Sequence, residues 1–180
     1  MAQRKNRSVG QPPARHARKH RISEETTMRF RISGLPAEPF QHLFALDDDA
    51  LKRHGALRRV AENSGYPCRV SLTDAKAGDE VILVNYEHQD ADTPYRSRHA
   101  VYVRKGERRY DAVGEIPEQL RKRLLSVRAF DESGMMVDAD VIEGRLLEEL
   151  LGRFFANDAV AYIHLHFARP GCYAARVDRI

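Results

Sequence analysis

Residues 159–178, AVAYIHLHFARPGCYAARVD, have the pattern that decides the fold of this chain. In Ala159–Ala168 apolar side chains recur at every second position, which is the period of a β-strand with one face on a core. Cys172–Asp178 has the same period. The residues between them, Arg169-Pro170-Gly171, favour a three-residue hairpin loop in which Gly171 takes the left-handed conformation. We therefore predict a C-terminal antiparallel β-hairpin.

The predicted register gives the two faces of this hairpin different chemistry. Its pairs are Ala168–Cys172, His166–Ala174, His164–Arg176 and Tyr162–Asp178. One face is apolar, includes Tyr173, and is expected to face the core, because a one-residue slip would exchange the two faces. The other face carries polar and reactive side chains. These are Tyr162, His164, His166, Cys172, Arg176 and Asp178.

This polar face has three interpretations. His164 and His166, two residues apart on a strand, can share a divalent metal ion, with Cys172 diagonal to His166 as a third ligand. Alternatively, the guanidinium of Arg176 can bind an anionic ligand. The remaining alternative is a polar outer face without a ligand.

Four residues outside the hairpin are further site candidates. Cys68 is either a nucleophile activated by a nearby histidine or a small buried hydrophobe. His99 shares a strand face with two valines, so it is either a core histidine or an acid–base catalyst. His88 follows a strand, where residues that contact ligands often lie. Arg69 offers a planar guanidinium that suits a carboxylate or phosphate.

The first functional hypothesis is a small-molecule site for an anionic ligand, with or without enzymatic activity. Its ligand-binding residues are Arg69, His88 and Arg176, and its catalytic candidates are Cys68, His99, His164, His166 and Cys172. The second is a metal-binding protein that uses His164, His166 and either Cys172 or a further histidine. The third is a non-enzymatic interaction module. The chain has no phosphate loop, dinucleotide fingerprint, nucleophile elbow or His-Glu-x-x-His motif, so the common enzyme classes with such motifs are disfavoured.

Charge divides the 180 residues unevenly. The net charge is +4, but residues 1–27 carry seven Lys or Arg residues and two Glu, which leaves residues 28–180 at −1. The leading segment has no aromatic residue, so we predict a disordered basic tail over 1–27 and a single domain over 28–180. The tail is a solvated extension or, less favoured, a weak arm for nucleic acid.

Targeting and cysteine patterns indicate a cytosolic protein. No run of 18 apolar residues predicts a membrane span, and the N-terminus has no secretory signal. Cys68 and Cys172 are far apart in the chain, so free thiols are expected. The sequence leaves the oligomeric state open.

The remaining elements are predicted from hydrophobic period and turn residues. Strands are expected at 28–33, 57–61, 68–72, 81–86 and 99–104, and a hairpin at 127–130 and 135–137. Helices are expected at about 48–54 and 117–125, and the main core helix is expected to start near Asp140 and to include Phe154. This irregular mixture indicates an α+β fold with a largely antiparallel sheet and two or three helices.

Six blocks in this order resemble the uncharacterised bacterial family DUF 1203, a domain of unknown function. They are FRISGLPAEPF, PCRVSLTDAKAGDEVILVNYEHQ, PYRSRHAVYVR, YDAVGEIPEQLRKRLLSVRAFD, MMVDADV and YIHLHFARPGCYAARVDR. The resemblance covers residues 28–180 and implies one compact bacterial cytosolic domain. It implies no activity, cofactor or substrate, so function has to be argued from the site.

Overall fold

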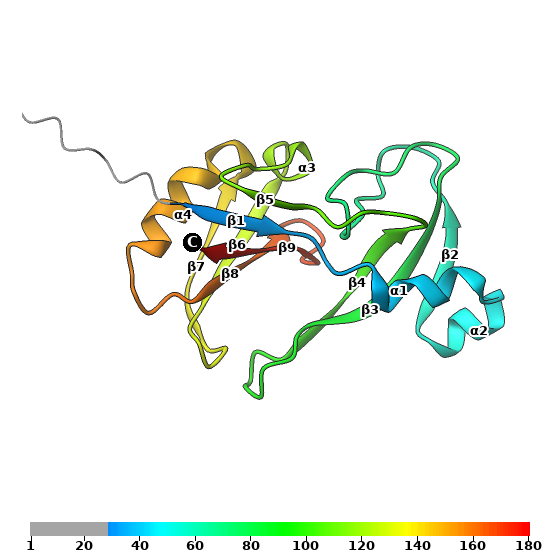
Figure 1. The fold of residues 1–180 in the computed structure, drawn as a ribbon, viewed down its shortest axis with the longest axis horizontal. Coiled ribbons are helices and arrows are strands. Elements are labelled where there is room, and N and C mark those ends of the chain that lie inside the picture. Colours follow the sequence, from blue (N-terminus) through cyan, green and yellow to red (C-terminus); the bar gives the residue numbers. More distant parts are fainter. Residues whose placement is uncertain (1–28) are drawn as a thin grey trace, which may run out of the picture.

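A computed structural model describes residues 29–180, which form two antiparallel sheets with four short α-helices (Figure 1). The six-stranded sheet has the order β5-β1-β9-β8-β6-β7. Its strands are β1 Phe30–Ser33, β5 Asp111–Val113, β6 Leu124–Phe130, β7 Met136–Glu143, β8 Tyr162–Phe167 and β9 Tyr173–Arg179. The three-stranded sheet is β2 Ala56–Val60, β3 Glu80–Gln89 and β4 Ser97–Arg104. The predicted α+β class is confirmed, although two sheets occur where one was expected.

The helices are α1 Glu38–Gln41, α2 Asp48–Arg53, α3 Glu118–Arg121 and α4 Leu147–Phe155. None of the helices in residues 29–180 has both the length and the apolar character needed to cross a membrane. The predicted tail, residues 1–27, lies outside the described part of the chain.

Helix α4 covers the core of the six-stranded sheet. Leu147, Leu150, Leu151 and Phe154 recur at helical spacing, and all four are buried in the main hydrophobic cluster. The predicted core helix therefore exists, but its predicted start near Asp140 is wrong. Asp140 belongs to β7, where it pairs with Val127 of β6. The residue expected to cap the helix is therefore part of the sheet.

Two other local predictions are wrong. The helix expected over 117–125 is only the single turn of α3, because Leu125 lies in β6 with its side chain fully buried in the sheet core. The strand expected over 68–72 is instead a series of turns, in which the amide of Arg69 donates to the carbonyl of Tyr102. The hairpin around the 131–134 turn is confirmed, and β7 is longer than predicted.

The C-terminal hairpin confirms half of its predicted register. His164 pairs with Arg176 and Tyr162 pairs with Asp178, and Gly171 has a positive φ of 73°. Nearer the loop the prediction is wrong, because His166 pairs with Tyr173.

The physical reason is a β-bulge in which Ala174 is the extra residue of β9. Cys172 consequently lies in the connection, outside both strands. The bulge also moves Tyr173 off the apolar face on which the alternation placed it: it packs in the hydrophobic cluster of the three-stranded sheet, whereas Ala175 and Val177 stay in that of the six-stranded sheet.

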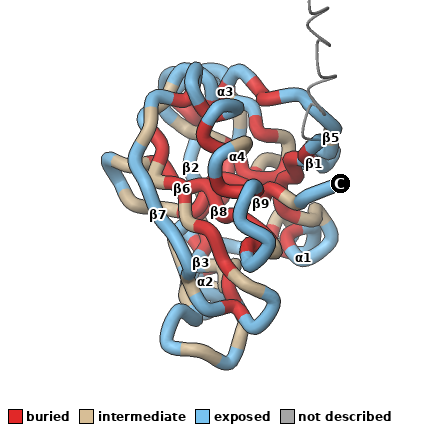
Figure 2. Tube along the Cα trace, turned by 90° about the vertical axis from the view of Figure 1, so that its left-hand side faces the viewer, coloured by how far each residue is buried: buried red, intermediate tan, exposed pale blue. Residues whose placement is uncertain are grey.

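Strand β8 is buried on both faces, so the expected open polar face does not exist. All six of its residues are buried (Figure 2). Only 1% of His164 and 0% of His166 remain exposed. One face packs against α4 and the main cluster. The other packs against the end of β3 and the start of β4, where His88 and His99 lie in aromatic contact with the β8 histidines.

Two glycines test how closely the chain after β1 packs against Arg69 and Val70. A Cβ at Gly34 would clash with the backbone carbonyls of Arg69 and Val70, whereas a Cβ at Gly152, inside α4, would meet nothing within 4 Å. We expect Gly34→Ala to lower the free energy of unfolding by about 1–3 kcal/mol. Gly152→Ala should raise it by about 0.5–1 kcal/mol, because alanine is the better helix former. Urea denaturation of both variants measures the difference, and equal effects would contradict the packing described.

Candidate functional site

Four histidines from both sheets form one group, here called the histidine cluster: His88 of β3, His99 of β4, and His164 and His166 of β8. The ring centroid of His88 lies 4.8 Å from that of His99, 5.5 Å from that of His164 and 5.3 Å from that of His166. His88 is the unpaired residue where the β3–β4 register shifts between Glu87 and Gln89. Such a bulge re-aims a side chain, and here it is the residue directed at the β8 histidines.

Tyr173 closes the cluster on another side. Its ring is stacked on His88 with centroids 4.5 Å apart, and it meets His164 edge-on at 5.1 Å. Tyr173 is buried, and it is opposite His166 because of the Ala174 bulge. Sequence reasoning missed this residue, since strict alternation assigns it to the other face of β9.

Hydrogen bonds determine which ring nitrogens are available. Nδ1 of His166 lies 3.1 Å from the carbonyl oxygen of Gly171, and because a carbonyl only accepts, Nδ1 carries the proton and Nε2 is the free nitrogen. Nε2 of His88 lies 2.7 Å from Nδ1 of His99, which leaves Nδ1 of His88. Nδ1 of His88, Nδ1 of His164 and Nε2 of His166 are buried without a hydrogen-bond partner in the described residues.

These three histidines have metal-site geometry. One ring nitrogen from each of His88, His164 and His166 can be chosen so that all three lie within 4.8 Å of one another. Buried polar atoms without partners are uncommon in folded proteins, so three of them in one group call for an explanation. A bound metal ion is one that uses the lone pairs of all three.

Burial keeps the imidazoles neutral. It lowers the pKa of His164 to about 2 and those of His88 and His166 to about 3, and neighbouring positive groups add to the effect. Arg128, on β6 opposite His164, is one such group. The pKa of His99 is also lowered by burial. Neutral imidazole is the form that binds metals, so these rings are already in the metal-binding protonation state.

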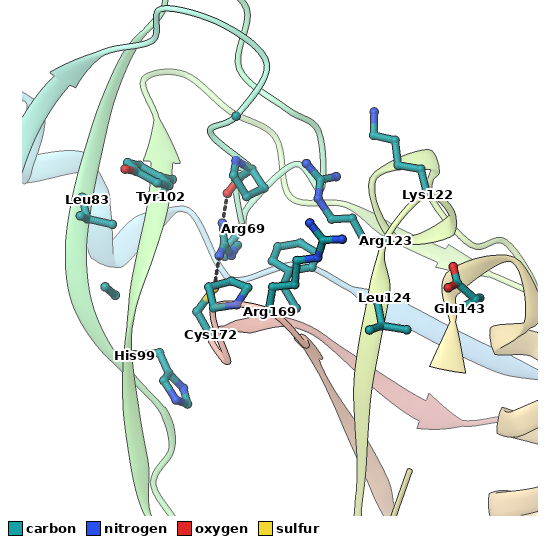
Figure 3. Close-up of a pocket in the computed structure, with 15 residues that line it drawn as sticks. Arg69, Leu83, His99, Tyr102, Lys122, Arg123, Leu124, Glu143, Arg169 and Cys172 are labelled. Carbon is teal, nitrogen blue, oxygen red and sulfur yellow. Dashed lines mark hydrogen bonds between the residues drawn. The ribbon is translucent and has the colours of Figure 1, made fainter. Parts of the chain in front are cut away.

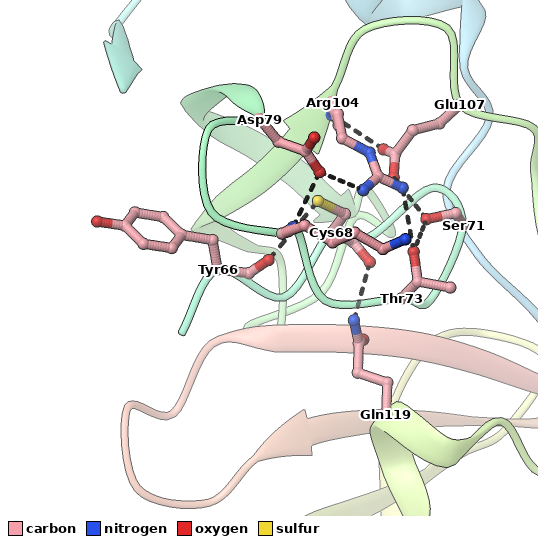
Figure 4. A network of polar contacts seen from close by, with 9 residues as sticks. Tyr66, Cys68, Ser71, Thr73, Asp79, Arg104, Glu107 and Gln119 are labelled. Atoms are coloured by element: carbon pink, nitrogen blue, oxygen red, sulfur yellow. Dashed lines mark hydrogen bonds and ion pairs between the residues drawn. The ribbon is translucent and has the colours of Figure 1, made fainter. Parts of the chain in front are cut away.

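Cys68 belongs to a hydrophobic cluster that includes no member of the histidine cluster. Its side chain is fully buried with Ala61, Ala75 and Val81, and its Sγ lies 3.6 Å from the carbonyl oxygen of Tyr66 (Figure 4). Burial raises the pKa of its thiol to about 12, with the nearby Glu107 carboxylate adding to the shift. Because the thiolate is the nucleophilic form, these surroundings favour a structural role for Cys68.

Arg69 links the two sheets from a buried position. Its Nε donates to the carbonyl of Tyr173 at 2.8 Å, its Nη1 to that of Pro67, and its Nη2 to Sγ of Cys172 at 2.9 Å (Figure 3). These three contacts use all arms of the guanidinium. Burial lowers its pKa, although an arginine remains charged. Arg69 is therefore engaged by the protein itself, and none of its three hydrogen-bond partners in residues 29–180 is a carboxylate.

Arg176 is partly engaged as well. Its Nε donates to Asp178 at 2.8 Å, and its guanidinium lies over the ring of Tyr162 at 4.0 Å. The structure thus brings together His88, His99, His164 and His166, places Arg176 beside His164, and separates Cys68 from them.

A family model described as "Protein of unknown function (DUF1203)" matches residues 65–179. The chain belongs to this family. The DUF1203 match includes every member of the histidine cluster and excludes β1, α1, α2 and β2, so it is shorter than the resemblance expected over 28–180. Searches of curated proteins and of solved structures give no match. For this DUF1203 protein, the geometry of the site is the source of functional inference.

The lowered pKa values predict acid-sensitive stability. In the unfolded chain His164 and His166 take up protons near their ordinary pKa of 6.5, whereas in the folded protein they do so only at about 2 and 3. The unfolded state therefore binds more protons as the pH falls below 6.5. The free energy of unfolding of the metal-free protein should fall by up to about 1.4 kcal/mol per pH unit for each histidine.

Urea denaturation at about pH 7.5 and about pH 5.5 checks this. His166→Gln should reduce the pH dependence, and the matched variant of an exposed histidine, His54→Gln, should leave it unchanged. The same pH dependence in all three proteins would contradict the assignment.

Proposed function

We propose that this protein binds one divalent transition-metal ion through His88, His164 and His166. The observation that carries the proposal is the convergence of three imidazoles, those of His164 and His166 fully buried and that of His88 partly buried, each with a buried ring nitrogen that has no hydrogen-bond partner in residues 29–180. His164 and His166 are the pair that the sequence suggested, and His88 replaces Cys172 as the third ligand. Burial of β8 on both faces supports this choice, because an unpaired polar atom is costly there.

The ligand type indicates the class of metal. Imidazole nitrogens suit zinc, copper, iron and nickel, whereas magnesium and calcium need oxygen ligands. Zinc binds histidine nitrogens at about 2.0–2.1 Å, which separates tetrahedral ligands by about 3.3 Å. The nitrogens here lie within 4.8 Å of one another, so their separations exceed the zinc value by at most about 1.5 Å.

Two of the three ligands have supporting hydrogen bonds. The carbonyl of Gly171 accepts from Nδ1 of His166, which leaves Nε2 of that ring for the metal. Nε2 of His88 lies 2.7 Å from Nδ1 of His99, and in the proposed site Nε2 of His88 is the donor, which leaves Nδ1 of His88 for the ion. Such outer contacts orient the ligands in known metal sites. We infer that His99 is a positioning residue for His88.

The positive charge of Arg128 favours a negatively charged fourth ligand. Its guanidinium is half-buried, donates only to Ser126 Oγ at 3.4 Å, and has no carboxylate partner in residues 29–180. A cation at this place disfavours the metal ion alone but favours a metal that carries an anion or hydroxide. Three protein ligands leave the fourth position open, which is the arrangement of catalytic zinc sites.

Titration of untagged, chelator-treated protein with Zn²⁺ and Co²⁺ tests the proposal. We expect one equivalent to bind with Kd below about 1 µM, and the cobalt form to show the visible absorption of a low-coordinate nitrogen site. His166→Ala and His88→Gln should abolish this binding. His99→Gln, which removes only the supporting bond, should weaken it by about 10–100-fold.

Two control variants alter histidines outside the proposed metal site. His54→Gln alters an exposed histidine of the described chain, and the double variant His16→Gln/His20→Gln alters the two histidines of the N-terminal segment. Both should bind like the unaltered protein, and circular dichroism should show every variant folded. Absence of binding, or binding that survives in folded His166→Ala and His88→Gln, would overturn the proposal.

A further inference from the structure

A cavity of about 960 Å³ opens between the two sheets and is lined by His99 but by none of the three proposed metal ligands (Figure 3). Its walls come from β3 and β4, from residues 65–69, from the start of β6 and from the loop between β8 and β9. This volume lies in the range of small-molecule sites. His99 lines the cavity and bonds to His88, so the cavity is adjacent to the histidine cluster.

Positive charge dominates the wall. Its charged members are four basic residues and one acidic residue: Arg69, Lys122, Arg123, Arg169 and Glu143. Asp74, behind the wall, pairs with both Lys122 at 3.2 Å and Arg123 at 2.8 Å. With Asp74 included, an excess of two positive charges remains.

The two charges that lack a carboxylate partner in residues 29–180 have different positions. Arg69 is a buried member of the wall, and each of its three guanidinium nitrogens donates to a group of the protein. Arg169 is exposed in the β8–β9 loop and makes no side-chain hydrogen bond to the described residues. A buried, uncompensated guanidinium raises the electrostatic potential of the cavity, and Arg169 offers free donors there.

The rest of the wall is apolar. Phe167 lies under two guanidinium groups, with the centre of Arg69 at 4.8 Å and that of Arg123 at 5.1 Å from its ring centroid. Leu83, Leu124 and Tyr102 add further apolar and aromatic surface. A ligand that fits this wall has one apolar or aromatic part and one anionic group.

We propose that this cavity binds a small organic anion, a carboxylate or phosphate ester with an apolar group, whose charge contacts Arg169 and Arg123. The proposal does not depend on the metal, because none of its contacts involves the three ligand histidines. It also differs from the anion site suggested by the sequence, since Arg176 does not line the cavity and three of the five N–H donors of Arg69 already bond within the protein.

Cys172 provides a probe inside the cavity. It lines the wall and is partly exposed, whereas Cys68 is fully buried. Iodoacetate and iodoacetamide alkylate a thiolate by the same reaction: sulfur bonds to the methylene carbon and iodide leaves. Only iodoacetate is an anion, so the ratio of its rate to that of iodoacetamide at Cys172 measures the electrostatic attraction and cancels the reactivity of the thiol.

We expect this ratio, measured by peptide mass spectrometry on metal-free protein, to exceed that of the urea-unfolded chain by about tenfold. Arg169→Gln should reduce the ratio by about three- to tenfold, and Arg123→Gln should reduce it in the same direction. Arg53→Gln removes the same charge from α2, outside the cavity wall, and should leave it unchanged. A ratio equal to that of the unfolded chain, or one that Arg169→Gln does not lower, would overturn the proposal.

Protection experiments identify the ligand chemistry. Millimolar phenyl phosphate or benzoate should slow iodoacetamide labelling of Cys172, whereas neutral benzamide should not. Protection by one anion alone assigns phosphate or carboxylate as the preferred group, and protection by neither overturns the proposal. If Cys172 reacts with neither reagent, calorimetric titration of phenyl phosphate and benzoate into the unaltered protein and Arg169→Gln decides, and equal heats in the two proteins would overturn the proposal.

Discussion

Burial of β8 on both faces is the constraint on which the rest of the molecule depends. A strand covered on one side only would expose His164 and His166 to water, where unpaired ring nitrogens are readily solvated. Here the main cluster covers one face, and the ends of β3 and β4 cover the other. The imidazoles are thereby desolvated, kept neutral and brought next to His88, so a simple β-hairpin becomes one wall of a candidate metal site.

Two irregularities in the sheets complete this site. The bulge at His88 directs that side chain from β3 toward β8, and the bulge at Ala174 directs Tyr173 from β9 against the same histidines. Bulges near functional sites are frequently the means by which a strand presents a particular side chain. Arg69 contributes from the other side, since it holds the carbonyl of Tyr173 and the thiol of Cys172 in place. The same arginine adds positive charge to the neighbouring cavity. Arg69 therefore both links the two sheets and raises the electrostatic potential of the cavity.

Much of the fold could be predicted from sequence, because local period and turn chemistry decide it. The hairpin around Gly171, the helix after Asp47 and the α+β class follow from such local patterns. Segments whose local pattern competes with sheet pairing were assigned wrongly. Asp140 resembles a helix cap but extends β7. Leu124 lies at helical spacing from Leu120 but belongs to β6, because pairing with β7 and β8 places the neighbouring Leu125 in the sheet core.

The sequence by itself determined which reactive side chains are present and half of the site: His164 and His166, separated by one residue, on one strand face opposite the aliphatic set. It named His88 and His99 as candidates but contained no signal that joins them to β8, since contact between two separate sheets has no local period. Only the tertiary structure decided that all four meet, that Tyr173 changes face, and that Cys68 lies in a different cluster. The physical reason is that burial and bulges depend on long-range packing, whereas alternation along a strand depends only on the neighbouring residues.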